Sequence, residues 1–459
     1  MYFSIRAAHG EDMHTDTFSG PVLRPGEPEY DAEVAGFQTA YTHRPALVVG
    51  ARHTEDVRAA VEYAARHGFP VAVQATGHGL SVPAEDGVLI STRRMTGIRI
   101  DPARRTARIG AGVRAGALID AAAEHGLAPL TGSSPSVGVV GYTLGGGLGL
   151  LARRHGYAAD HVREIELVTA DGRVRTLRPG DDLFGAVLGT GGNFGVVTAL
   201  EVELVPVRTV HGGQLVFDTE LVAPALAAWR DWTATVPDAL TSSFTMLRYP
   251  DIEQVPAAVR GRYVASIRIA FDGPAEAGQR LAGPLRAVGD RLRDDLRDMP
   301  YTESHTIHAD PDHPHPYAAT NALLGEFTGA TAAALLDTAG PDGAVAAVLD
   351  IRHLGGALAE PGPATPVADR SAPFLVRVIT MPEPGAGRVA PEEHGLVRTA
   401  LAPWTVGHSL AFLYGAGDSA DEAQTRAGYR PEVYARLAGL KTAYDPHNMF
   451  RFNRNIRPA

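Results

Sequence analysis

Glycine fills six of the thirteen positions in the stretch VGVVGYTLGGGLG, residues 137–149. Each glycine loses more conformational freedom on folding than other residues, so such a run persists where the backbone needs a positive φ or close approach by a partner. Backbone N–H groups exposed in this way can hold a pyrophosphate, although tight loop packing would also explain the run. A second cluster, Gly191-Gly192-Asn193-Phe194-Gly195, follows later in the chain. Two such clusters favour one large phosphate-bearing cofactor.

The glycine run is not a dinucleotide fingerprint of the G-x-G-x-x-G kind, because no strand-to-helix unit with a later acidic residue surrounds it. The surrounding pattern predicts alternating strands and helices. PALVVGA is expected to be a strand, and Thr54 is expected to cap a helix that ends at Gly68. Further strands are expected at PVAVQ, VLIST, TARIG and FGVVTALEVELVPV, and EIELVTADGRVRTL is expected to form a hairpin about Asp171-Gly172.

Beyond Val207 the order of strands and helices changes. The alternating runs GGQLVFD, RYVASIRIAF and PFLVRVIT are separated by Ala-rich helical stretches, and PEVYARLAGLKTAYDP is expected to be the final helix. This pattern predicts an antiparallel sheet covered by helices on one side, and an α+β chain as a whole. We expect an extended N-terminal arm over 1–42 that packs on the body, domains over 43–207 and 208–415, and a C-terminal segment over 416–459.

The composition of the chain limits the kinds of molecule that it is expected to bind. The chain has 459 residues, a net charge of −10 without blocks of like charge, and no cysteine. The charge disfavours nucleic acid and anionic membranes, so a small-molecule substrate is expected. The missing cysteines exclude disulfides and thiolate metal sites. No apolar run reaches the ~18 residues of a membrane span, and the first residues lack a secretory pattern. We therefore expect a cytoplasmic monomer or homodimer.

Five motifs in order carry a family resemblance: RPALVVGA, GHG around His78, SPSVGVVGYTLGGGLG, GTGGNFGVVT and YDPHNMFRFNRNI. Together they resemble the berberine-bridge branch of the vanillyl-alcohol-oxidase superfamily across essentially the whole chain. The resemblance implies an FAD-binding domain of the p-cresol-methylhydroxylase (PCMH) type, with two subdomains built from the first 207 residues and the C-terminal segment. It also implies an FAD-linked oxidase that passes a hydride from an organic substrate to flavin N5 and is reoxidised by O2.

The resemblance implies that His78 is bonded to the 8α-methyl carbon of the flavin, a role that suits a neutral imidazole nitrogen. Ser134 stands where many relatives have a second, cysteinyl link, so the attachment is expected to be single and the pocket wide enough for bulky natural-product substrates. Val137 matches a position where a small residue admits dioxygen. Besides His78, the FAD contacts implied by the motifs are Gln74, Ala75, Thr76, Gly77, Gly79, Leu80, Thr131, Gly132, Ser133, Val137, Gly138, Gly141, Tyr142, Gly145, Gly146, Gly149, Asn193, Gly195, Val196, Val197, Asn453 and Asn455. Gln74 replaces a common arginine of the motif, and Ala75-Thr76 replace glycines.

The acid–base candidates lie on the predicted strand VLDIRHLGGA, which matches the substrate-facing strand of the family. Alternation places Asp350 and Arg352 on one face and Ile351 and His353 on the other. Asp350 is the candidate base and Arg352 a candidate for fixing the substrate, unless the two form an ion pair on the solvent side. Tyr142 and Tyr414 are further candidates. HSLAFLYG lacks the asparagine of the family's Y-x-N motif, which removes its support for a catalytic tyrosine there.

Two other sites and two other functions remain to be weighed. His305, His308, His313 and His315 could suggest metal binding, but three prolines among them favour a solvated loop, and no metal is expected. A G-x-S-x-G nucleophile elbow does not occur. The alternatives to an oxidase are a flavin-containing cyclase or rearrangement enzyme with no net redox change, and a flavoprotein that binds a ligand without turnover.

Overall fold

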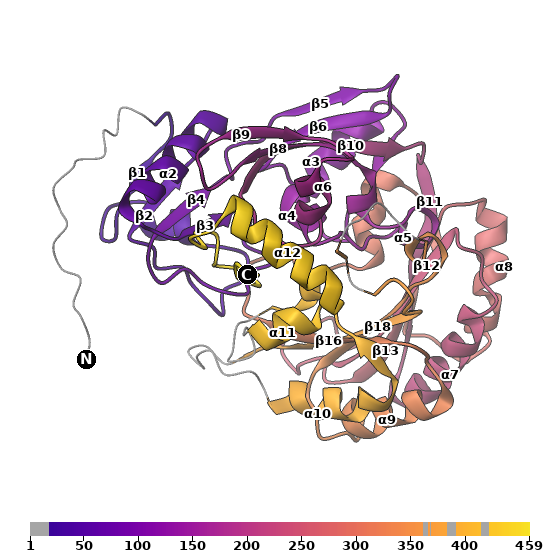
Figure 1. The fold of residues 1–459 in the computed structure, drawn as a ribbon. Coiled ribbons are helices and arrows are strands. Elements are labelled where there is room, and N and C mark those ends of the chain that lie inside the picture. Colours follow the sequence, from indigo (N-terminus) through magenta and orange to yellow (C-terminus); the bar gives the residue numbers. More distant parts are fainter. Residues whose placement is uncertain (1–17, 361–365, 368, 383–391, 415–421) are drawn as a thin grey trace.

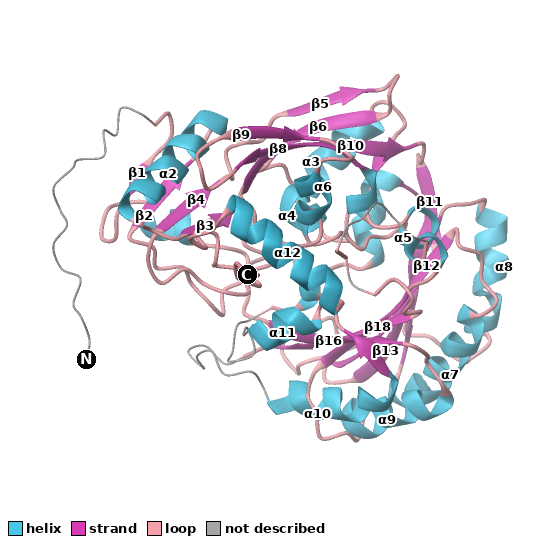
Figure 2. Cartoon of the chain, in the orientation of Figure 1, coloured by secondary structure: helices cyan, strands magenta, loops and turns pink. Residues whose placement is uncertain are grey.

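A computed structural model describes residues 18–360, 366–367, 369–382, 392–414 and 422–459. Its described strands form three sheets, and the first two lie beside each other at the end of the molecule opposite α10 (Figure 1). The first part of the chain contributes helices and strands to two smaller sheets, whereas the middle part forms one large sheet. Figure 2 shows helices packed beside the strands throughout the molecule. The predicted boundary between residues 415 and 416 lies outside the described residues.

The first sheet has the order β1-β2-β4-β3, with β2, β4 and β3 parallel and β1 antiparallel. Its strands are β1 (Val22–Leu23), β2 (Leu47–Gly50), β3 (Val71–Gln74) and β4 (Val88–Ser91). Helix α2 (Thr54–His67) buries Val57, Ala60, Val61 and Ala64 against it and ends at Gly68, whose positive φ of 68° an L side chain rarely adopts. The predicted cap is wrong: Thr54 is the first helical residue, and its hydroxyl donates to Glu166 instead.

The second sheet is antiparallel and holds the glycine-rich stretches at its border. Its strands are β5 (Ile98–Asp101), β6 (Thr106–Gly110), β7 (Ala128–Pro129), β8 (Val162–Val168), β9 (Val174–Leu177) and β10 (Val196–Val205). The helices in its core are α3 (Ala115–Ala123), α4 (Val139–Leu144), α6 (Asp182–Val187) and α12 (Pro431–Tyr444). Through Tyr434, Leu437 and Ala438, α12 brings the end of the chain back into this core.

The third sheet is antiparallel and follows the order β14-β11-β13-β12-β17-β18-β16-β19, with β15 also paired to β11. Its strands are β11 (Thr209–Phe217), β12 (Leu240–Arg248), β13 (Tyr263–Phe271), β14 (Arg293–Asp294), β15 (Arg297–Pro300), β16 (Ala318–Leu324), β17 (Val348–His353), β18 (Phe374–Thr380) and β19 (Thr405–Gly407). The helices along its outer side are α7 (Val222–Thr233), α8 (Ala275–Arg286), α9 (Gly329–Ala339) and α10 (Glu392–Leu401) (Figure 1).

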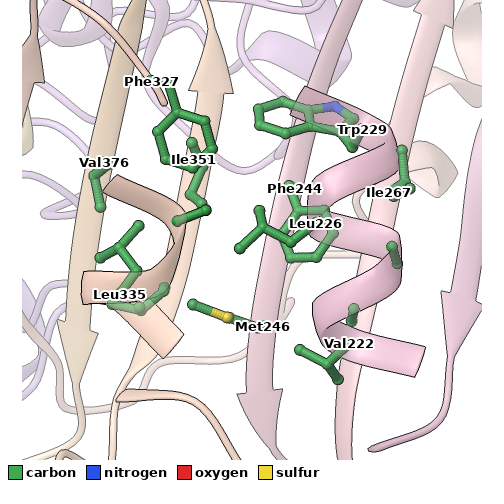
Figure 3. Packing of buried hydrophobic residues seen from close by; sticks show 14 of the residues in the cluster. Val222, Leu226, Trp229, Phe244, Met246, Ile267, Phe327, Leu335, Ile351 and Val376 are labelled. Atoms are coloured by element: carbon green, nitrogen blue, oxygen red, sulfur yellow. The ribbon is translucent and has the colours of Figure 1, made fainter. Parts of the chain in front are cut away.

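The core under these outer helices is built from one face of each strand. Trp229 of α7 packs against Phe244, Phe327 and Phe374, with ring centroids 5.8 to 6.1 Å apart (Figure 3). Ile351 of β17 belongs to the same cluster. Because side chains alternate along a strand, Asp350 and Arg352 point to the inner face of the sheet, away from α7 to α10, as predicted.

The α+β class, the two subdomains of the first part of the chain and the antiparallel sheet covered by helices on one side are confirmed. The described part of the arm differs from the extended segment expected for 1–42. It adds β1 to the first sheet and contains the short helix α1 (Tyr30–Val34), whose Tyr30 and Val34 are buried. No helix in the described ranges combines the length and apolar character needed to cross a membrane.

Candidate active site

A large cavity of about 540 Å³ lies where the three sheets meet. Its wall combines the loop after β3, the stretch from Gly132 to Leu148, the loop before β10, the inner face of the third sheet and the C-terminal tail. A small side cavity of about 30 Å³ adjoins it, because both share Ser133, Leu148 and Arg352 in their walls. Segments that are far apart in sequence therefore enclose one space.

His78 lies in the cavity wall, held by residues from three separate segments. Its ring stacks on Phe37 of the arm at 3.8 Å. Its Nδ1 lies 2.9 Å from the Thr76 hydroxyl and its Nε2 lies 3.0 Å from the Ser136 hydroxyl. The Tyr317 hydroxyl, from the third sheet's side, donates to the His78 carbonyl oxygen. Burial, with the nearby positive charge of Arg114, lowers the pKa of His78 to about 4, so the imidazole is neutral at physiological pH.

The loop that carries His78 offers unused hydrogen-bond donors. The backbone N–H groups of Gly77, His78, Gly79 and Leu80 have no acceptor among the described residues, and all four residues line the cavity. Successive free N–H groups make an anion site. Val73, which precedes them on β3, exposes 42% of its surface although the rest of this strand's apolar side chains are buried. An anion-binding loop next to an uncovered apolar side chain fits the pyrophosphate and rings of FAD.

The glycine run itself has a partly different role from the one predicted. Residues 139–144 form the short helix α4, in which the Val139 N–H donates to the Val113 carbonyl and the Tyr142 N–H donates to the Gly138 carbonyl. A Cβ at Gly147 would lie 2.7 Å from the Tyr142 ring, and a Cβ at Gly149 would lie 2.9 Å from its hydroxyl. These glycines therefore make room for Tyr142, whose hydroxyl is buried without a partner in the described structure. Free N–H groups are also found outside this run, at 77–80.

Most residues predicted to contact the cofactor line this cavity. The exceptions are Thr131, Gly146, Gly149, Asn193, Val196 and Asn455. Asn193 is fully buried and joins the second glycine cluster to the tail: its amide donates to the carbonyls of Thr190 and Arg454, and its side-chain oxygen accepts from Ile456. Gln74 lines the cavity, but its side chain is bonded to the carbonyl of Val34 in the arm. The side chains of Asn193 and Gln74 therefore connect separate segments of the chain around the cavity.

Asp350 lies at the centre of a charged cluster on the inner face of the third sheet. Its Oδ2 accepts from Arg352 Nε at 2.9 Å and from Arg377 Nη1 at 3.0 Å, and its Oδ1 accepts from the Thr245 hydroxyl at 3.2 Å. Arg377 and Thr245 are its direct cross-strand neighbours. Burial alone would raise the pKa of Asp350, but the charges of Arg352, Arg377 and Arg268 outweigh it and hold the pKa far below its usual range.

This environment corrects the role predicted for Asp350. A carboxylate with so low a pKa binds a proton weakly, so it is a poor general base. The open alternative, an ion pair on the solvent side, is also wrong, because Asp350 is buried and Arg352 lines the cavity. Asp350 instead anchors two arginines. Of the predicted catalytic residues, Arg352, Tyr142 and Tyr414 reach the cavity wall. Burial raises the pKa of Tyr142, which makes this phenol a donor rather than a base.

Several residues of the wall were not predicted, and some left a signal in the sequence. Arg268 and Arg377 each stand alone in an apolar strand, at the alternate position that faces away from the helices. Phe37 and Tyr317 left no comparable signal, because each acts through distant packing on His78.

The histidine-rich stretch is also less solvated than expected. His305 is exposed within a 3-10 helix (Tyr301–Ile307), whereas His308 lines the side cavity and His315 the main one. No group of three or more metal-ligating side chains is found in the described ranges.

Comparisons with known proteins agree with this geometry. Residues 45–178 match the family described as FAD binding domain, and residues 420–457 match the family described as berberine and berberine like. (R)-6-hydroxynicotine oxidase from Paenarthrobacter nicotinovorans is 29% identical, with 96% of this chain and 97% of that protein aligned. The uncharacterized FAD-linked oxidoreductase YgaK from Bacillus subtilis is 25% identical, with 97% and 98% aligned.

Solved structures give the same result. That of 6-hydroxy-D-nicotine oxidase from Arthrobacter nicotinovorans has a TM-score of 0.83 at 27% identity and covers 98% of this chain and 100% of its own. Chitooligosaccharide oxidase has a TM-score of 0.82 at 20% identity, covering 96% and 97%, which shows the shared fold. These matches confirm the resemblance, FAD as the cofactor and the oxidase class. The chain is an FAD-linked oxidase with an FAD-binding domain and a berberine-like C-terminal segment, and it is similar over nearly its whole length to (R)-6-hydroxynicotine oxidase.

Proposed function

We propose that this enzyme oxidises a small organic substrate in the large cavity, with FAD attached through a single bond to His78. The observation that carries the proposal is a neutral, half-buried imidazole in the cavity wall, held by Phe37, Thr76 and Ser136 next to a loop of free N–H groups. Bound FAD would supply the two-electron acceptor, taking a hydride at N5 and passing the electrons to dioxygen.

His78 is suited to covalent attachment by its surroundings. A neutral imidazole has one basic nitrogen with a free electron pair, and each ring nitrogen here faces a hydroxyl that can either donate or accept. Stacking on Phe37 fixes the ring plane. Ser134 bonds to the Ser136 hydroxyl at 2.9 Å, so it belongs to the hydrogen-bond chain that orients His78 and offers no second link.

The proton lost by the substrate needs an acceptor other than Asp350. Tyr414 lines the cavity, packs edge-on against the Tyr317 ring at 5.6 Å and lies close enough to Arg352 for their charges to interact. We therefore assign the proton-accepting role to Tyr414 and a hydrogen-bond-donating role to Tyr142.

Acid precipitation tests the attachment. Wild-type protein should keep its yellow colour in the pellet, and His78→Ala should release FAD into the supernatant. His125→Ala, which removes an exposed histidine, is the matched control and should behave as wild type. Loss of flavin from the wild-type pellet would exclude the covalent bond.

Anaerobic mixing tests the reaction. A panel of aromatic and aliphatic alcohols and amines is added without oxygen, and the flavin absorbance is followed. Bleaching by at least one compound indicates net oxidation, and Tyr414→Phe should slow that bleaching by about 10² or more, the lower range for a general base. Product formation without bleaching would favour a cyclase or rearrangement enzyme instead.

A further inference from the structure

The inner face of the third sheet, which points away from α7 to α10, carries more positive than negative charge. Arg268, Arg352 and Arg377 lie there around Asp350, and their charges act on it together. Asp310 is the acidic residue among the described cavity walls. Against the three guanidinium groups, Asp350 supplies one carboxylate on the sheet face and Asp310 a second on a neighbouring loop, which leaves positive charge in excess at this wall. Buried charges are normally paired, so this excess indicates a missing anion.

The two arginines of the main cavity also keep unused donors. Arg352 and Arg377 each bond to Asp350 through one nitrogen, and both bonds end on the same carboxylate oxygen. The Arg377 Nε is buried without a partner in the described structure. Their side chains are 16% and 13% exposed, and both residues line the cavity. Since a guanidinium has five N–H donors in a planar fork, these two can still bind a carboxylate in bidentate fashion.

The surroundings of this arginine pair are aromatic. Phe412 lies under both guanidinium groups, 5.4 Å from Arg352 and 4.5 Å from Arg377. Tyr142 and Tyr414 stand in the same wall. Stacking on Phe412 fixes the planes of the guanidinium groups, and the phenol rings offer apolar surface for the body of a ligand.

We propose, resting on the oxidase function above, that the substrate is a carboxylate whose anionic end binds Arg352 and Arg377 and whose apolar or aromatic body lies among the tyrosines. Asp350 holds the two arginines in place and leaves their remaining donors turned to the cavity. The arginine pair selects for the charge of the substrate, and the tyrosines perform the proton transfers.

The test is equilibrium binding of benzoate and of benzamide, its uncharged analogue of similar shape, to the oxidised holoenzyme by calorimetry. Benzoate should bind at least tenfold more tightly, because charge-assisted hydrogen bonds are worth about ten- to a hundredfold each. Arg377→Gln should weaken benzoate about tenfold or more and change benzamide less than threefold. Arg377→Lys, which keeps the charge but loses the fork, should lie between. Arg248→Gln, at the exposed end of β12 and outside the cavity wall, is the matched control.

Thermal unfolding of each variant confirms that it is folded, and Arg352→Gln repeats the measurement should Arg377→Gln not fold. Equal binding of benzoate and benzamide to wild type would overturn the proposal, as would equal weakening of both by Arg377→Gln. Unchanged benzoate binding together with a lowered flavin midpoint potential in Arg377→Gln would also overturn it, because the arginines would then balance the charge of reduced flavin. These readouts need no turnover, so they fail independently of the oxidase proposal.

Discussion

Replacing Asp350 with asparagine separates an anchoring carboxylate from a catalytic base. The change removes the charge that two arginine bonds of 2.9 and 3.0 Å converge on. Removing one partner of a buried ion pair costs about 3 to 5 kcal/mol. Both arginines keep some exposure to the cavity, so we expect the lower figure, about 3 kcal/mol. With about 2.1 cal/mol/K of unfolding entropy per residue, a chain of 459 residues should lose about 3 °C in Tm.

The same substitution should affect binding in the opposite direction. Freed from their carboxylate, Arg352 and Arg377 should bind benzoate several-fold more tightly than in wild type. The low pKa of Asp350 stabilises the fold at every pH above its ordinary unfolded value of about 3.9, and this contribution is lost only as pH falls below it. The pH profile of turnover between 5 and 9 should therefore contain no step from Asp350.

Circular dichroism, calorimetry and anaerobic flavin reduction on Asp350→Asn decide between the two roles, with the exposed Asp231→Asn as the control. Wild-type Tm together with flavin reduction slowed by 10² or more would refute the anchoring role and restore Asp350 as the base.

Two further predictions concern other walls of the cavity. Val137→Leu adds bulk beside Gly138 in the cavity wall, so stopped-flow reoxidation by air should slow well beyond any change in flavin reduction; equal slowing of both half-reactions would indicate general mispacking. Lys441→Met removes a fully buried ammonium that lies 2.7 Å from Asp445 and donates to the Asn193 carbonyl at 2.6 Å. Urea unfolding should show a loss of about 3 to 5 kcal/mol, partly recovered in the double variant with Asp445→Asn, whereas no recovery would mean that the carbonyl contacts of Lys441 dominate.

The fold could be predicted from the sequence wherever short-range pattern decides it. Strand alternation placed Ile351 in the core and Asp350 on the other face, and Gly68 ended α2 as expected. Pattern could not predict that Gln74 would be bonded to the arm, because that contact joins residues 40 positions apart. Pattern also could not show that Gly147 and Gly149 leave space for the Tyr142 side chain. A glycine needed for a ligand and one needed for a neighbouring side chain look alike in sequence.

The two halves of the site differ in how far sequence can define them. The cofactor half is built largely from backbone, so its requirement for glycine and free N–H groups recurs as motifs, and those motifs led to His78. The substrate half is a sheet face whose character depends on which side chains the register brings together. From its own strand alone, Asp350 is predicted to be a base. Arg377 on one neighbouring strand and Arg268 further across the sheet hold its pKa low, so Asp350 instead neutralises part of the charge of an arginine cluster. The class of substrate is therefore better inferred from the charge balance of that face than from any motif on a single strand.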